Sequence, residues 1–109
     1  MFSPATESRC RLAIQAEYHK AKKEHRDFGS LHEGWAVMRE EWEETAKELS
    51  SAAAEMNAMW EYVKQDDAPD ARVRAHHVQA DALAVMKEAA QLAAMAWKMI
   101  DYCNEVLCE

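Results

Sequence analysis

The sequence contains few residues that interrupt helices. Only 2 of its 109 residues are Gly and 2 are Pro, whereas the helix formers Ala, Glu, Lys, Leu and Met are common. Half of the residues are hydrophobic, so the chain can form a core. This composition predicts an all-α fold, and the length predicts a single domain covering residues 1–109.

Other absences restrict the class of protein. No run of about 18 apolar residues occurs, and MFSPATESRC lacks an apolar signal-peptide stretch, so we expect neither a membrane span nor export. Cys10, Cys103 and Cys108 form no CxxC motif and cannot all pair, which favours free thiols in the cytoplasm. The net charge of −7 argues against binding to a nucleic-acid backbone, but not against a nucleotide bound through a metal ion.

Three helical segments are expected. The first should cover residues 6–26, with Thr6 or Ser8 as its N-cap. A turn follows in which Gly29 supplies permissive dihedral angles and Ser30, with Glu33 three residues later, forms a capping box.

The second segment runs from residue 31 to about residue 63, and KQDDAPD forms a linker at residues 64–70. The third covers residues 71–106, with a possible break at His76-His77. These adjacent histidines point to different sides, so they do not form a helical metal pair.

Apolar residues recur along the second segment at steps of three and four. They are Leu31, Trp35, Met38, Trp42, Thr45, Leu49, Ala53, Met56, Trp60 and Val63. This seam is typical of a bundle or coiled-coil helix, and core packing is expected for all four tryptophans. The third segment is apolar on two sides, which predicts a central helix or one buried against a second subunit. We therefore expect a bundle of three to four helices, with long antiparallel second and third helices, completed by oligomerisation.

Acidic residues crowd the second segment, where Glu40, Glu41, Glu43 and Glu44 occur within five residues. Glu40, Glu41 and Glu44 share one helix side with Glu33 and Glu48, and one interpretation is a solvated face, because this side lies nearly opposite the apolar seam. The other is a cation site, because Lys and Arg are scarce at the positions that would offset the charge. Both interpretations remain open on spacing alone.

Glu88 lies between the two apolar stripes of the third segment, on one side with Asp81 and Gln91. A carboxylate in such a position needs a partner. A basic residue (Lys87, Lys98 or Arg39) and a metal ion are both suitable.

Two blocks of the sequence resemble a known family. DFGSLHEGWAVMREEWEE followed by KEAAQLAAMAWKMID is similar to the MazG-like all-α nucleotide pyrophosphohydrolases, particularly small phage-type members, over residues 27–103. That family has ExxE on one helix and ExxD on a later one. Glu41 and Glu44 match the first motif, and Glu88 matches the second, but Gln91 stands where Asp is expected.

The resemblance implies a homodimer or higher homo-oligomer that binds Mg²⁺, with Mn²⁺ as a possible substitute. It implies hydrolysis of a nucleoside triphosphate to the monophosphate and pyrophosphate. Residues implied as metal ligands are Glu41, Glu44, Glu88 and Gln91, with Asp81 as a compensating ligand, and those implied in catalysis are Glu40 and Glu41. Gln91 removes one negative charge and cannot act as a base, so we expect weakened or lost activity.

Three hypotheses follow from the sequence. The chain is an Mg²⁺-dependent nucleotide pyrophosphohydrolase, a related binder of nucleotides or metal without turnover, or a non-catalytic helical interaction module. The chain offers no Ser/His/Asp arrangement and no Gly-rich phosphate loop that would favour another chemistry.

Overall fold

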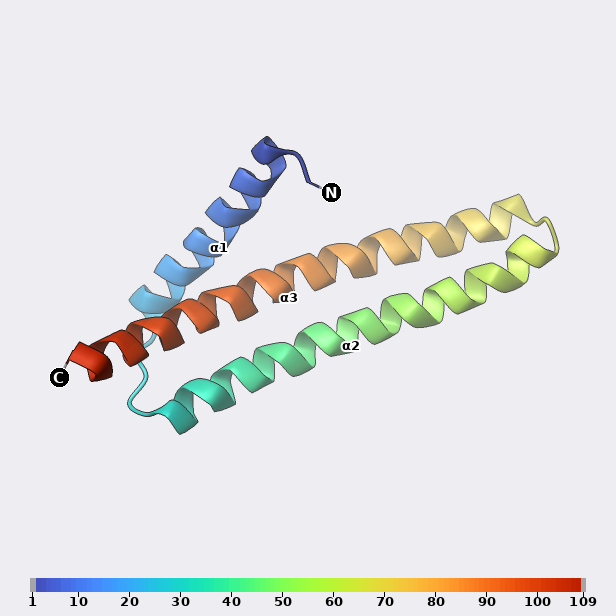
Figure 1. Cartoon of the computed structure of the whole chain (residues 1–109). Helices are drawn as coiled ribbons and strands as arrows, with labels where there is room; N and C mark the ends of the chain where they lie inside the picture. Colours follow the sequence, from blue (N-terminus) through green and yellow to red (C-terminus); the bar gives the residue numbers. More distant parts are fainter. Residues whose placement is uncertain (1, 109) are drawn as a thin grey trace. The chain divides into compact units, whose positions relative to one another are not determined.

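The structure is a computed structural model that describes residues 2–108, and it contains three helices (Figure 1). These are α1 (Pro4–Glu24), α2 (Leu31–Lys64) and α3 (Ala68–Cys108). No strand occurs within residues 2–108. The predicted all-α fold with long second and third helices is confirmed.

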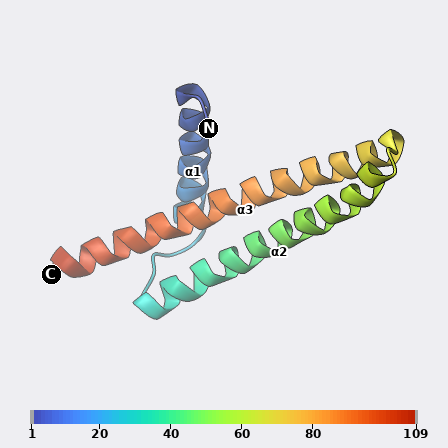
Figure 2. The same ribbon diagram turned by 45° about the vertical axis from the view of Figure 1, so that its right-hand side comes forward.

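The chain divides into two compact units. The first consists of Met1–Trp42 and Ala89–Glu109, and the second is Glu43–Glu88. The second unit, here called the hairpin unit, holds the end of α2 and the start of α3. Both views of the ribbon show these two helices running antiparallel and side by side toward their short connection (Figures 1 and 2).

Helix α1 begins two residues earlier than the sequence suggested. The N–H of Thr6 donates to Ser3 Oγ at 3.2 Å, and Pro4 occupies the first turn. Thr6 or Ser8 as the N-cap was therefore wrong. Proline has a backbone dihedral already suited to the first helical position, so the helix can start at Pro4.

The first unit has a small core that includes Ala21, Phe28 and Ala94. Gly34, in the first turns of α2, is buried against it. A Cβ at this position would lie 2.6 Å from Met99 Sδ and 2.9 Å from Phe28 Cδ2, so only glycine fits without a shift of its neighbours.

Gly29 has a different role from the one expected. No glycine among the described residues has a positive φ, so the prediction of a special dihedral angle there was wrong. Gly29 instead lies near the side chains of Arg26 and Glu33 and donates its N–H to the Glu33 carboxylate at 3.3 Å.

Tyr18 links α1 to α3 within the first unit. Its ring stacks on Trp97 with centroids 4.0 Å apart, and its hydroxyl donates to the Asp101 carboxylate. This hydrogen bond raises the pKa of the Tyr18 phenol above its usual value. Trp97 is therefore packed as expected.

The connection between α2 and α3 is short. Asp66 takes a left-handed conformation with φ 54°, and the N–H of Asp70 donates to Asp67 Oδ1 at 3.2 Å, which caps α3. The helix then continues through His76-His77, so the suggested break was wrong. Neither histidine removes a backbone donor, and His77 Nδ1 lies 3.4 Å from Glu55 Oε2.

The apolar seam of α2 does not face a core. Trp35, Trp42 and Trp60 are each more than half exposed, so the prediction that they are packed was wrong for the single chain.

The three cysteines are free, as expected. Within residues 2–108, no helix combines the length and apolar character needed to cross a membrane.

Candidate functional site

Three of the carboxylates singled out in the sequence lie close together. Glu41, Glu44 and Glu88 each offer an oxygen, and these oxygens all lie within 4.8 Å of one another. Glu41 and Glu44 are one turn apart on the uninterrupted helix α2, and Glu44 and Glu88 both belong to the hairpin unit. We call this set the carboxylate cluster.

The oxygens of the carboxylate cluster are slightly farther apart than one divalent cation requires. Two oxygens bound to one Mg²⁺ can be at most about 4.2 Å apart, so a small rotation of one side chain would bring the trio into range. Glu41 and Glu88 are half-buried, whereas Glu44 is exposed. Like charges this close favour bound cations or neighbouring donors, and Glu41 and Glu88 do interact with other groups of the chain.

A groove of about 520 Å³ opens within the first unit, and Glu41 is part of its wall. This volume is typical of pockets for small molecules. Acidic groups of its lining are Glu17, Glu24, Glu33, Glu40 and Glu41, and Gln91 adds an amide. Positive charge comes from Lys20, Arg26 and Lys98. The groove therefore offers both signs of charge to one ligand.

Lys98 is buried at the groove. Its ammonium group donates to the carbonyl oxygen of Arg26 at 3.0 Å and lies 4.7 Å from the centre of the Phe28 ring. The hydrogen bond and the aromatic face stabilise the charge out of bulk water. From the sequence, Lys98 was only an alternative partner for Glu88. Its contacts with Arg26 and Phe28 join distant parts of the chain, so the sequence could not indicate them.

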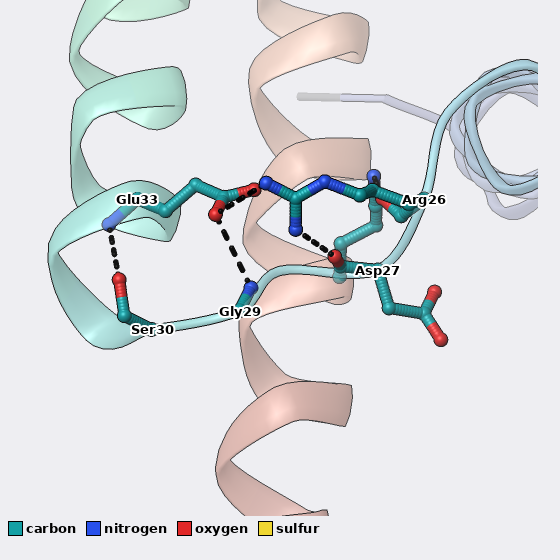
Figure 3. Close-up of polar contacts among 6 residues, drawn as sticks. Arg26, Asp27, Gly29, Ser30 and Glu33 are labelled. Carbon is teal, nitrogen blue, oxygen red and sulfur yellow. Dashed lines mark hydrogen bonds and ion pairs between the residues drawn. The ribbon is translucent and has the colours of Figure 1, made fainter.

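The loop before α2 holds Glu33 in place (Figure 3). Arg26 donates to the Glu33 carboxylate at 3.0 Å and to the Asp27 carbonyl at 3.2 Å, and the N–H of Gly29 donates to the same carboxylate. The N–H of Glu33 in turn donates to Ser30 Oγ at 3.0 Å. The Ser30 half of the capping box is confirmed, while the Glu33 carboxylate binds the N–H of Gly29 rather than that of Ser30.

The remaining predicted site residues lie in two places. Glu40 and Gln91 line the groove together with Glu41. Asp81 is outside the carboxylate cluster, and its carboxylate accepts a hydrogen bond from Ser51 Oγ at 3.0 Å. Asp81 precedes Glu88 by seven residues, so the two residues lie about 10 Å apart along the helix axis.

The fold and site together define a class: an all-α chain with carboxylates gathered from two helices and a groove of mixed charge. No protein-family model, curated protein or solved structure matches the chain. The likeness to MazG-like enzymes thus depends on the two sequence blocks described above.

Proposed function

We propose that this chain is an Mg²⁺-dependent nucleotide pyrophosphohydrolase of the MazG-like kind. It would cleave a nucleoside triphosphate between the α- and β-phosphates, in the cytoplasm, where its thiols stay reduced. The observation that supports this proposal most is the short distance between Glu41, Glu44 and Glu88. Spacing and family likeness had named these three residues among five expected ligands, of which Asp81 lies outside the cluster.

The residues would divide the work as follows. Glu41, Glu44 and Glu88 would hold the ion, with Mn²⁺ as a substitute for Mg²⁺. The bound ion supplies neutralisation of phosphate charge and polarisation of water. Glu40, beside Glu41 in the groove, would orient the attacking water, and Gln91 would offer a neutral oxygen.

The groove would receive the nucleotide. Lys20, Arg26 and Lys98 contribute positive charge, which suits phosphate groups that an ion on Glu41 does not neutralise. Neither Trp35 nor Trp97 is among the described residues that line this groove, so we assign neither to contact with the base.

Gln91 should limit turnover. Replacing Gln91 with Asp would restore the acidic second motif and provide a group that can bind the ion with full charge. We expect Gln91→Asp to release pyrophosphate at least about tenfold faster than the natural chain. The assay is a panel of NTPs and dNTPs with Mg²⁺ or Mn²⁺, measuring pyrophosphate.

Matched variants make this assay specific. In the Gln91→Asp chain, Glu41→Gln and Glu88→Gln should each lower the rate by about 100-fold or more. Loss of a residue that only hydrogen-bonds to a metal ligand costs about 10- to 100-fold, and loss of the ligand itself should cost at least as much. Glu61→Gln, an exposed site on the same helix as Glu41, should leave the rate unchanged. If the natural chain and Gln91→Asp are both folded and neither releases pyrophosphate from any nucleotide, the proposed hydrolase activity is refuted. Mg²⁺-dependent nucleotide binding without release would favour a binder instead.

One observation favours the non-catalytic alternative, an interaction module. Large apolar side chains are exposed along both α2 and α3. Such a surface is also compatible with an enzyme that assembles.

A further inference from the structure

The loop between α1 and α2, residues 25–30, is fixed to α3 in the first unit. The Phe28 side chain is only 7% exposed, and the buried Lys98 donates to the carbonyl oxygen of Arg26 at 3.0 Å. The ammonium group of Lys98 also lies 4.7 Å from the centre of the Phe28 ring. A ligand in the groove would therefore move the exposed side chains of this loop more easily than its backbone.

The side chain of Arg26 is held less firmly than its backbone. It lines the groove and is 74% exposed. Its Nη2 lies 3.0 Å from Glu33 Oε2, and its Nη1 donates to the Asp27 carbonyl at 3.2 Å (Figure 3). Exposed ion pairs contribute little to stability, because water and salt screen the charges. The guanidinium can therefore exchange Glu33 for another anion without disturbing the fold.

Glu33 occupies a set of donors that suits an oxyanion. Its Oε2 accepts from the Arg26 guanidinium and, at 3.3 Å, from the N–H of Gly29. Guanidinium and backbone N–H groups are donors with which proteins commonly bind phosphate. The Glu33 carboxylate thus takes the position of an anionic ligand on these two groups.

Arg26 is the cation of the groove that best suits phosphate. The lining includes five carboxylates, whereas its Lys and Arg residues are Lys20, Arg26 and Lys98. Lys98 is buried and already bonded to the loop, which leaves Lys20 and Arg26 as the exposed cations. Of these two, Arg26 offers a planar pair of donors that matches phosphate oxygens. An anion that enters without a metal ion should therefore contact Arg26.

Glu33 competes effectively for Arg26 because it belongs to the same chain. Its local concentration at the guanidinium far exceeds that of a free anion in solution. A singly charged carboxylate offers no more than Glu33 does and should not displace it. A pyrophosphate group carries several negative charges and can bond to two nitrogens of the guanidinium, so it can displace Glu33.

We propose that the Arg26–Glu33 pair is an exchangeable contact, in which a polyphosphate takes the place of Glu33 on Arg26. Glu33 is then an internal competitor that lowers the affinity of the groove for anions and admits only highly charged ones. The loop backbone stays fixed by Lys98 while the side chains exchange. The choice of phosphate as the anion rests on the proposed function, but the exchange itself involves neither a metal ion nor turnover.

Calorimetric titration with inorganic pyrophosphate in the absence of metal tests this exchange. Glu33→Gln should bind pyrophosphate at least about fivefold more tightly than the natural chain, because the competitor is lost. Arg26→Gln should weaken binding, and adding Glu33→Gln to that variant should change the affinity by less than about twofold. Equal gains from Glu33→Gln with and without Arg26 would overturn the proposal, as would a Glu33→Gln chain that binds no pyrophosphate.

Glu24→Gln is the matched control for the loss of charge. Glu24 lines the same groove, whereas the described hydrogen bonds of Arg26 go to Asp27 and Glu33. Its gain in affinity should be under about twofold, because salt screens a charge that does not contact the anion site. A gain equal to that of Glu33→Gln would show that only the total charge of the groove matters, and would overturn the exchange.

A second measurement follows the contact in the natural chain. The chain has only two glycines, Gly29 and Gly34, so their amide signals can be followed by NMR with isotope-labelled glycine. The Gly29 signal should shift as pyrophosphate is added, because its N–H is bonded to Glu33. The Gly34 signal should shift less, since its N–H donates to the Ser30 carbonyl at 3.2 Å. Pyrophosphate binding that leaves the Gly29 signal unchanged would contradict the exchange.

These titrations and the hydrolase assay can fail separately. If no nucleotide releases pyrophosphate but Glu33→Gln shows the gain that depends on Arg26, the exchange is supported and the hydrolase alone is refuted. If pyrophosphate is released but Glu33→Gln gains no affinity, the exchange alone is refuted.

Discussion

At the scale of single residues, Gly34 lets α2 pack tightly in the first unit. The space for a side chain there is taken by Met99 and Phe28, and the Phe28 ring is buried. Met99 is flexible and can move, but the ring has less freedom. Sequence alone indicated only that a glycine interrupts an acidic side, because both neighbours come from other parts of the chain.

Gly34→Ala should therefore destabilise the protein. The gain in helix propensity of up to about 1 kcal/mol is opposed by overpacking of about 1–3 kcal/mol, so a net loss of about 1 kcal/mol is expected. Gly29→Ala is the control, because a Cβ there would meet its nearest atom, Arg26 Nη1 on a flexible side chain, at 3.3 Å. Urea denaturation at fixed protein concentration measures both. Equal or greater stability of Gly34→Ala would show that the neighbours shift freely.

Glu55 gives a residue-scale prediction about pH. Its carboxyl pKa lies below the ordinary 4.5 because Arg74 and then His77 bond to the ionised form. The ionised carboxylate thus stabilises the folded state above about pH 4.5, and this contribution is lost as pH falls through the lowered pKa. Glu55→Gln should show a smaller fall in Tm between neutral pH and about pH 3 than the natural chain.

Glu61→Gln is the matched control for Glu55→Gln. Glu61 lies on the same helix and pairs with Lys64 at an exposed position, so its loss should leave the acid-induced fall in Tm nearly unchanged. Identical slopes for the natural chain and Glu55→Gln would contradict a stabilising role for the Glu55 contacts.

At the scale of elements, the sequence predicted which segments are helical. Breaker residues and capping patterns are local, so the ends of α2 were close to those observed. The linker expected at residues 64–70 was too long, because α3 already begins at Ala68. The N-cap at Ser3 was missed because Thr6 and Ser8 are equally suitable by type. The continuity of α3 through His76-His77 could not be foreseen from polarity alone.

The direction in which α2 faces was not predictable from its periodicity. The apolar seam identified the stripe correctly but not its partner, since α2 meets α3 through residues such as Glu55 and Ser51 instead. An apolar stripe predicts that another surface covers it, but it does not indicate whether that surface belongs to the same chain or to another molecule. The exposed seam is the reason to expect an assembly.

At the scale of the whole molecule, the candidate site was only partly predictable. Glu41 and Glu44 follow from helix spacing. Their meeting with Glu88 on a second packed helix was a hypothesis from the residues, and the family resemblance selected it, because nothing local connects residues so far apart. Oxygens of the three carboxylates lie within 4.8 Å of one another, and their pairing at one ion stays a prediction. The groove with Lys98 and Arg26 was not predicted, since its walls come from separate parts of the first unit.

Calorimetric titration with Mg²⁺ in the absence of nucleotide tests most directly whether carboxylates from two helices share one ion. We expect saturable binding by the natural chain and by the control Glu61→Gln, and its loss in both Glu41→Gln and Glu88→Gln. Binding by Glu88→Gln that equals that of the natural chain would contradict a shared site, and so would a natural chain that binds no Mg²⁺.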